Sequence, residues 1–348
     1  MGVAARGQAW KLAIGVSVPV LLVLLALLVR TGTSGAAGAP AGKAAQASLG
    51  DERSCAAYAG LPPGWGSDAH AGMVRVDGGS FVFGSERGYP DERPARPGLT
   101  SVKGFWIDRT EVTRAQFAAF VAATGYVTEA ERQGAAAVFH VPTAEELASR
   151  PYAWWTLQQG AQWRGGQPAG EALRADANLP VTLVTQADAL AYARWLGRDL
   201  PTEAEWEYAG KAGRSDGQLD TAPADAHGKP AANYWQGPFP QMDAGADGHA
   251  GLATVGCYAA NGFGLHDMIG NVWEWTADPY TGPRQPHANG DTAVAAGNAR
   301  AAAAAMVIKG GSFLCSPDYC VRYRASARES QERDLAAAHI GFRTVRRD

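Results

Sequence analysis

The sequence predicts an α+β fold with little regular secondary structure. Of its 348 residues, 43 are glycine and 20 are proline, which favours a loop-rich chain over a helical bundle. Three segments carry helix-start signals, and short strand-like runs lie among them. On length alone the chain could form one large domain or two small ones.

The first strand-like runs are Met73–Val76 and residues 80–83, which flank the turn residues Asp77, Gly78 and Gly79. Alternating apolar residues around a glycine turn are typical of a hairpin. We therefore predict that these two runs pair with each other at the start of the domain.

Three threonines predict helix starts. Thr113 with Gln116 forms a capping-box pattern, and the helix that follows is expected to end at Gly125. Thr185 begins a second helix, which is expected to end before Gly197, and Thr202 with Glu205 begins a third. The third helix is expected to turn Trp206 and Ala209 towards a core.

Two later segments lack these signals. After residue 210 the chain is rich in Gly, Asp, Pro and aromatic residues without helical period, which predicts long loops that bound metal ions could help to order. Residues 293–305 are alanine-rich and read as a surface insertion that favours helix.

The N-terminus predicts a membrane anchor or a signal peptide. Residues 12–29 are uncharged and largely apolar, and Arg6 and Lys11 precede them. The length of the run and the position of Arg30 favour an uncleaved inner-membrane anchor, with the folded part periplasmic or extracellular; cleavage would give a secreted protein. We expect residues 1–30 to form this segment, 31–54 a flexible linker and 55–348 a single domain.

Several function classes find no support. The net charge of −3 and the absence of a Lys/Arg cluster interleaved with aromatic residues argue against a nucleic-acid partner. The seven histidines show no zinc-type spacing, and no Gly-x-Ser-x-Gly elbow or phosphate-binding loop occurs.

The four cysteines are the candidate residues for metal binding, catalysis or disulfide formation. Cys315 and Cys320 lie five positions apart, and their sulfurs could bind copper(I), form a disulfide or attack a substrate. Outside the cytoplasm Cys55 and Cys257 could also form a disulfide, although spacing does not prove it.

Ordered motifs from residue 71 onward resemble the formylglycine-generating enzymes, the sulfatase-modifying factor family. The motifs are Gly79-Ser80-Phe81, Glu111-Val112-Thr113, Leu200-Pro201-Thr202-Glu203, Gly270-Asn271-Val272-Trp273-Glu274, Gly310-Gly311-Ser312 with Cys315 and Cys320, and Gly341-Phe342-Arg343. The resemblance implies a single domain with a variant C-type lectin fold.

The resemblance also implies a reaction. Cys315 and Cys320 would bind copper(I), with Ser312, Tyr319 and Trp273 around them. The enzyme would use oxygen and a thiol reductant to oxidise the cysteine of a Cys-x-Pro-x-Arg motif in a sulfatase polypeptide. Hydrogen is taken from the β-carbon of that cysteine, and the thioaldehyde hydrolyses to formylglycine.

Two calcium sites are expected as well. The spaced carboxylates of residues 243–248 partly match an EF-hand loop but lack its final glutamate. The resemblance implies a first site with side chains of Asn233 and Asp247 and carbonyls of Tyr234 and His249. A second site would use side chains of Asp267 and Glu274 with carbonyls of Gly270 and Val272.

Some positions depart from the family pattern. Ser316, the run 326–331, and His339 with Ile340 differ on segments expected to line the substrate cleft. Two alternatives therefore stay open: an oxidase of a small molecule or siderophore peptide, and a non-catalytic lectin-like binding module with a Cys315–Cys320 disulfide. Arg322 and Arg324 are interpreted as structural ion-pairing residues.

Overall fold

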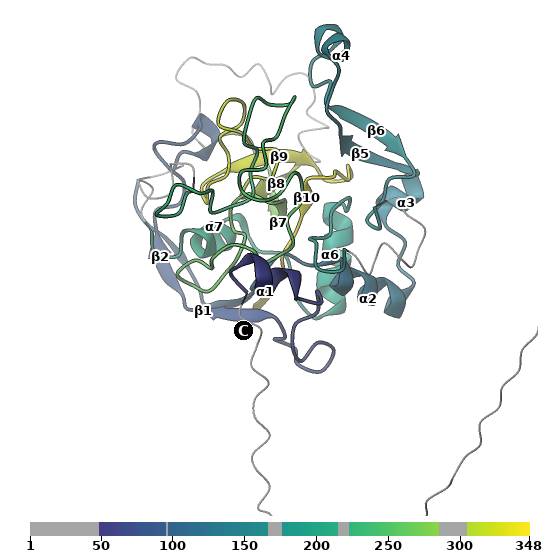
Figure 1. Cartoon of the computed structure of the whole chain (residues 1–348). Coiled ribbons are helices and arrows are strands. Elements are labelled where there is room, and N and C mark those ends of the chain that lie inside the picture. The colour runs from purple at the N-terminus through teal and green to yellow at the C-terminus, as the bar shows by residue number, and fades with distance from the viewer. Residues whose placement is uncertain (1–48, 95–96, 166–175, 215–222, 285–304) are drawn as a thin grey trace, which may run out of the picture. The chain divides into compact units, whose positions relative to one another are not determined.

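The computed structural model describes residues 49–94, 97–165, 176–214, 223–284 and 305–348 (Figure 1). The apolar run 12–29, residues 31–48 of the predicted linker and the alanine-rich insertion, apart from Ala305, lie outside these ranges, whereas residues 49–54 of that linker lie inside them. Within them, no helix has the length and apolar character to span a bilayer. The described residues belong to one compact unit, Ala45–Asp348.

The three predicted helices are confirmed: α2 (Arg114–Thr124), α6 (Gln186–Trp195) and α7 (Glu203–Lys211). Each begins after a threonine that forms a complete capping box with the residue three positions on. α2 ends at Gly125, which has the left-handed backbone that favours glycine (φ 66°). Local signals thus determined where these helices start.

The predicted N-terminal hairpin is wrong. β1 (Met73–Val76) pairs with β4 (Phe105–Asp108), whereas β2 (Gly79–Phe81) pairs with β3 (Thr100–Val102). The buried face of β1 needs apolar partners, and β4 supplies Phe105 and Ile107, both fully buried. Gly78 lies in the turn between β1 and β2. A Cβ atom there would lie 2.8 Å from the Val102 carbonyl oxygen, because the backbone of residues 102–104 packs closely against this turn.

The remaining strands form two further sheets and complete the first. β11 (Val345–Arg347) joins β4. A two-stranded arm consists of β5 (Ala135–Phe139) and β6 (Trp155–Gln159), with the short helix α4 (Ala144–Ser149) at its tip (Figure 1). The four-stranded sheet has the order β10 (Ile340–Gly341), β7 (Trp273–Pro279), β8 (Ala305–Lys309) and β9 (Arg328–Glu332).

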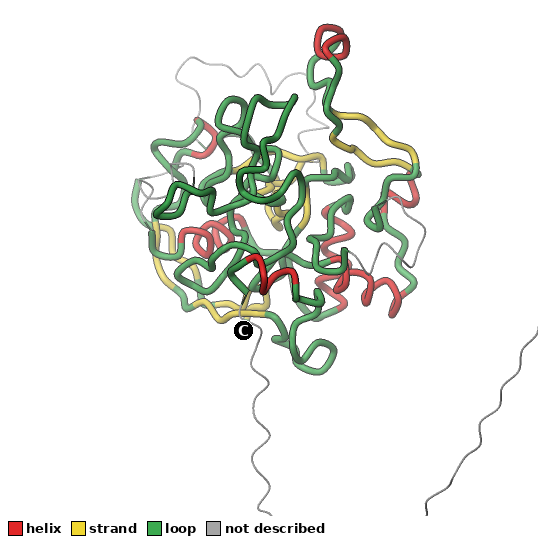
Figure 2. The backbone as a smooth tube through the Cα atoms, viewed as in Figure 1, coloured by secondary structure: helices red, strands yellow, loops and turns green. Residues whose placement is uncertain are grey.

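Loops make up much of the molecule, as expected. Besides α4, the described short helices are α1 (Glu52–Ala56), α3 (Glu129–Gln133) and the 3₁₀ turn η1 (Pro90–Glu92). In its described part, the chain between α7 and β7 contains neither helix nor strand (Figure 2).

A disulfide between Cys55 and Cys257 closes a separation of 202 residues, which answers the pairing question that the sequence left open. In the chain-entropy model such a crosslink contributes about 5 kcal/mol.

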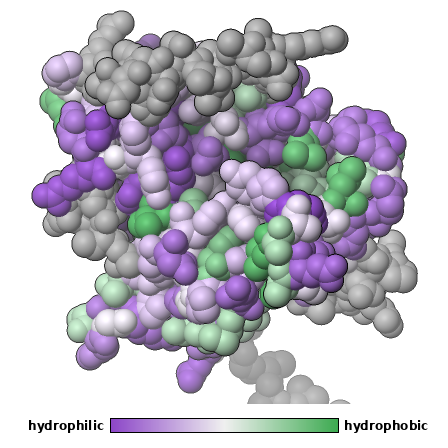
Figure 3. Space-filling view, turned by 90° about the horizontal axis from the view of Figure 1, so that it is seen from above, coloured by the Kyte–Doolittle hydropathy of each residue, from purple (hydrophilic) through white to green (hydrophobic). Residues whose placement is uncertain are grey.

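The two largest apolar clusters of the described chain pack helices against strands and the C-terminal segment. In the larger one, Phe117 of α2 and Tyr192 of α6 pack on Phe342, with ring centroids 6.4 and 5.4 Å away. In the smaller one, Trp206 of α7 packs with Phe105 and neighbouring strand residues. Viewed from above, the described surface is a mosaic of apolar and polar patches (Figure 3).

A buried ion pair between Arg343 and Glu274 connects the C-terminal segment to β7. Arg343 donates to both carboxylate oxygens of Glu274, each at 2.7 Å, and both side chains are essentially inaccessible to solvent. Its remaining hydrogen bonds go to backbone carbonyls that include those of Asp108 and His266. Trp206 also donates to Glu274, at 2.7 Å.

We expect Arg343→Met to lower the free energy of unfolding by about 3–5 kcal/mol, because it leaves the buried Glu274 carboxylate without its counter-charge. Arg347→Met is the matched control, since Arg347 forms ion pairs with Asp199 and Glu205 at the surface, where its side chain is 38% exposed. The control should lose about 1 kcal/mol or less. Equal losses in chemical denaturation followed by tryptophan fluorescence would contradict this assignment.

Candidate functional site

The chain after β8 turns sharply to present the two cysteines. Gly311 has φ 82°, and a Cβ atom there would lie 2.4 Å from the Arg322 carbonyl oxygen. Ser316 and Cys320 exchange backbone hydrogen bonds of 3.0 and 3.1 Å, which closes the loop. Cys315 and Cys320 therefore lie at the two ends of one tight loop.

Cys315 and Cys320 are free thiols with sulfur atoms 3.5 Å apart. Burial opposes ionisation of Cys315, but the Cys320 thiol, nearby backbone and Arg322 together lower its pKa below the usual value. The hydrogen bond to Cys315 and burial both raise the pKa of Cys320. Cys315 is thus the more readily ionised sulfur, while Cys320 retains its proton.

Both thiols line a pocket of about 360 Å³. All three residues expected around them, Ser312, Tyr319 and Trp273, line the same pocket. Ser312 is fully buried and Trp273 is 4% exposed, whereas Tyr319 is 47% exposed. Burial raises the pKa of Tyr319 to about 12, so its hydroxyl stays protonated at neutral pH. The structure therefore brings the five predicted residues together.

Four aromatic pocket residues were not predicted. Tyr152, Trp154 and Trp155 come from the β5–β6 arm, and Phe239 comes from the loops after α7. Phe239 stacks on Tyr319 with centroids 4.5 Å apart and planes 8° from parallel. The Tyr-Ala-Trp-Trp run at 152–155 was the available signal, but nothing in it shows that the arm folds towards the cysteines.

Positions that depart from the family pattern also lie in this wall. Glu329, Ser330, Gln331 and His339 line the pocket, as expected for a substrate cleft. Burial lowers the pKa of His339 to about 3, so this imidazole is neutral, and its Nδ1 has no hydrogen-bond partner.

Arg322 and Arg324 act structurally, as interpreted from the sequence. Arg322 forms ion pairs with Asp91 and Glu92 at 2.9 and 3.2 Å, and Arg324 pairs with Glu92. The run 321–324 is not a strand, because these ion pairs, and not a ladder of hydrogen bonds, hold it against η1. The cysteine loop is thereby fixed to a distant segment of the chain.

Part of the first predicted calcium set is brought together. Asn233 and Asp247 are buried, and Asp247 accepts hydrogen bonds from the backbone of Tyr234 and of His249, at 3.2 and 2.9 Å. The Gln236 amide donates to both the Asp247 carboxylate and the Tyr234 carbonyl, so these two oxygens converge on one donor. Convergent carboxylate and carbonyl oxygens are a donor set that suits calcium.

The second predicted set is already engaged. Both oxygens of Glu274 accept from Arg343, and Asp267 accepts from the Gly256 N–H at 2.5 Å. Burial and the neighbouring Asp267 raise the pKa of Glu111 well above the usual value. At neither predicted set, nor elsewhere in the described chain, is a group of three or more His, Cys, Asp or Glu side chains arranged to hold a metal ion. Because the Glu274 carboxylate is already paired with Arg343, the second set fits calcium less well than the first.

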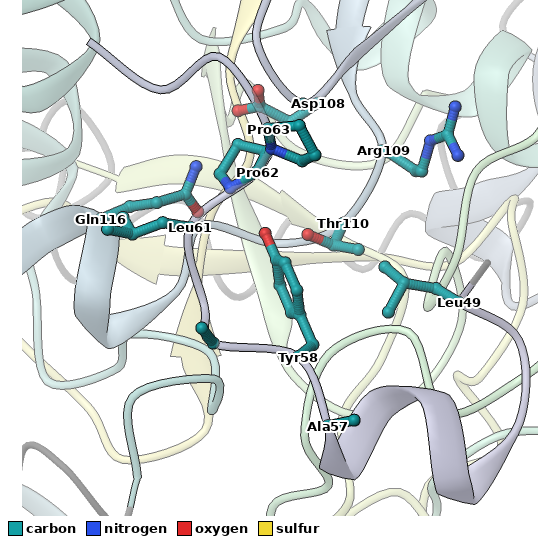
Figure 4. A pocket seen from close by; sticks show the side chains of 12 residues that line it. Leu49, Ala57, Tyr58, Leu61, Pro62, Pro63, Asp108, Arg109, Thr110 and Gln116 are labelled. Carbon is teal, nitrogen blue, oxygen red and sulfur yellow. The ribbon is translucent and has the colours of Figure 1, made fainter. Parts of the chain in front are cut away.

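A second pocket, of about 260 Å³, lies beside α1 and contains none of the predicted site residues (Figure 4). The Tyr58 ring stands within it, and Asp108, Arg109 and Thr110 form part of its wall (Figure 4). It lacks a cysteine, so the thiol pocket is the candidate site.

Comparison with known proteins identifies the family. A family model described as a sulfatase-modifying factor enzyme 1-like domain matches residues 61–348. A protein of Mycobacterium tuberculosis named formylglycine-generating enzyme is 44% identical over 295 residues, covering 78% of this chain and 97% of the relative. One of the same name from Streptomyces coelicolor is 42% identical over 282 residues, covering 78% and 88%.

Two further similarities are to a relative named as inactive and to a solved structure. A mouse protein named inactive C-alpha-formylglycine-generating enzyme 2 is 36% identical over 282 residues, covering 78% of this chain and 84% of the relative. The solved structure of PvdO from Pseudomonas aeruginosa has a TM-score of 0.53 at 24% identity, covering 79% and 94%. The expected fold is confirmed, and the chain belongs to the sulfatase-modifying factor family of formylglycine-generating enzymes.

Proposed function

We propose that this protein is a copper-dependent oxidase that converts the cysteine of a Cys-x-Pro-x-Arg motif in sulfatase polypeptides to formylglycine. The observation that carries the proposal is the pair of free thiols, 3.5 Å apart, in the wall of an aromatic pocket. Relatives at 41–44% identity that are named formylglycine-generating enzyme support the same reaction.

The donor set fits copper(I). Two soft sulfurs match a soft ion, and a low coordination number leaves room for a substrate thiolate. Cys315 and Cys320 would hold the ion, and the lowered pKa of Cys315 favours the thiolate that ligation needs. When bound, copper(I) supplies the electron transfer that activates molecular oxygen.

The proposed reaction balances with an external reductant. The cysteine side chain, oxygen, two electrons and two protons give the aldehyde, hydrogen sulfide and water, and a thiol supplies the electrons. One Cβ–H bond and the C–S bond break. The Ser312 and Tyr319 hydroxyls can donate hydrogen bonds to sulfur or reduced oxygen, while the buried Trp273 ring excludes water from one wall.

The shape of the pocket supports a polypeptide substrate. Glu329, Ser330 and Gln331 are consecutive residues of β9, and all three line the pocket. Ile308 of β8, which pairs with Glu329, and Trp273 of β7 also line it, so the pocket lies over one face of the sheet and extends to β9. β9 is the last strand of its sheet as described, and such an edge can bind an extended peptide.

We also propose that the domain works outside the cytoplasm. The Cys55–Cys257 disulfide supports an oxidising compartment. Membrane attachment through residues 12–29 if they are not cleaved, or secretion if they are, remains a prediction from the sequence.

Calcium at the first oxygen set is a further part of the proposal. Asn233, Tyr234, Asp247 and His249 belong to the long loop region between α7 and β7, which has little regular structure of its own. A cation there would replace the Gln236 amide as the partner of Asp247 and of the Tyr234 carbonyl. Its expected role is to order these loops.

The first prediction concerns the reaction. The soluble domain with copper(I), oxygen and a thiol reductant should convert a Cys-x-Pro-x-Arg peptide to the aldehyde. Mass spectrometry should detect the peptide with an aldehyde in place of the cysteine thiol. Cys315→Ser and Cys320→Ser should each lose at least 100-fold in rate, because one sulfur cannot hold copper(I) in the required geometry.

Three other outcomes would redirect the proposal. An unchanged peptide with copper bound would favour oxidation of a small molecule, for which a pocket of about 360 Å³ is large enough. No copper binding at all would favour a non-catalytic binding module. Conversion by both serine variants at wild-type rate would remove the thiol pair from the mechanism.

The second prediction concerns calcium. At saturating calcium the wild-type domain should melt about 5 °C or more above its value in chelator, because a ligand that binds only the folded state stabilises it. Asp247→Asn should abolish this shift. Asp225→Asn, at an exposed loop carboxylate, should retain it. A wild-type melting temperature that is the same with calcium and with chelator would end the calcium proposal.

A further inference from the structure

The cysteine pocket contains one acidic side chain among the described residues that line it, Glu329. The only histidine in the same wall, His339, is neutral because burial lowers its pKa to about 3. The acidic charge that this wall can offer to an incoming group therefore comes from Glu329, whose pKa is raised by burial against the opposing effect of Arg322.

Glu329 is accessible and only partly neutralised. Its side chain is 44% exposed, and its nearest cationic atom is Arg322 Nε, 3.3 Å from the carboxylate. The same guanidinium also forms ion pairs with Asp91 and Glu92, at 2.9 and 3.2 Å. One positive charge is thus shared by three carboxylates, and Glu329 can accept a second cation from the pocket side.

Aromatic rings complete the environment of this carboxylate. Tyr152 is 62% exposed, and its ring centroid lies 5.6 Å from that of Trp154. Trp154 in turn contacts both Phe239 and Tyr319 edge to face, at 5.3 Å. A carboxylate and aromatic rings in the wall of one pocket are a combination that binds planar cations, because each component attracts positive charge.

We propose that Glu329 determines substrate specificity by pairing with a cationic side chain that lies close in sequence to the reacting cysteine. The inference rests on the proposed function and deepens it by naming the residue that selects the charge. A guanidinium fits best, since it can donate to the carboxylate and stack on the aromatic wall at once. The competing role for Glu329 is structural, as a partner of Arg322 alone.

The test compares two peptides on two proteins. One peptide carries arginine in Cys-x-Pro-x-Arg, and the other carries citrulline, its neutral near-isostere, at the same position. Wild type should prefer the arginine peptide by about tenfold or more in kcat/KM, the size expected for one charge-assisted hydrogen bond. In Glu329→Gln this ratio should fall to near one, through loss on the arginine peptide.

Glu332→Gln is the matched control, because Glu332 lies on the same strand but is exposed and absent from the pocket wall. It should retain the wild-type ratio. A purely structural Glu329 would slow both peptides equally and leave the ratio unchanged, which would overturn the inference while conversion itself upheld the proposed function.

A binding measurement separates the two proposals. Fluorescently labelled peptides with alanine in place of the cysteine are titrated without copper, and anisotropy gives Kd for the arginine and citrulline forms. The same tenfold preference, lost in Glu329→Gln, would support the inference even if no peptide were oxidised. Equal affinities in wild type, or no binding of either peptide, would overturn it.

Discussion

The buried pair of Arg343 and Glu274 is the constraint on which the rest of the domain depends. A guanidinium out of water is tolerated only when its donors are satisfied, and here they reach Glu274 and backbone carbonyls of two separate segments. Trp206 brings α7 to the same carboxylate. In a chain with short strands, this shared partner fixes the C-terminal segment, β7 and α7 in one arrangement.

Charged side chains play a similar part around the cysteine loop. Lys309, at the end of β8, is fully buried and forms an ion pair with Glu207 of α7 at 2.9 Å. Beyond the loop, Arg322 and Arg324 attach the chain to η1 through Glu92. Both ends of the segment that carries Cys315 and Cys320 are therefore held by charge. This suits a site whose two sulfurs must stay close without forming a bond.

The pocket brings together parts of the chain that are far apart in sequence. The thiols come from the loop after β8, the aromatic wall comes mainly from the β5–β6 arm, and the acidic position comes from β9. Each part brings a different property: a pair of thiols, an aromatic surface and a carboxylate.

The sequence by itself determined the helix starts at Thr113, Thr185 and Thr202, because capping depends on residues three positions apart. It also marked the cysteine pair and its nearest neighbours through ordered motifs. Only the tertiary structure decided that β1 pairs with β4, that Cys55 joins Cys257 and that Trp154 and Glu329 share a wall with Cys315. These contacts link residues far apart in the chain, and local patterns of side chains carry no information on such distances.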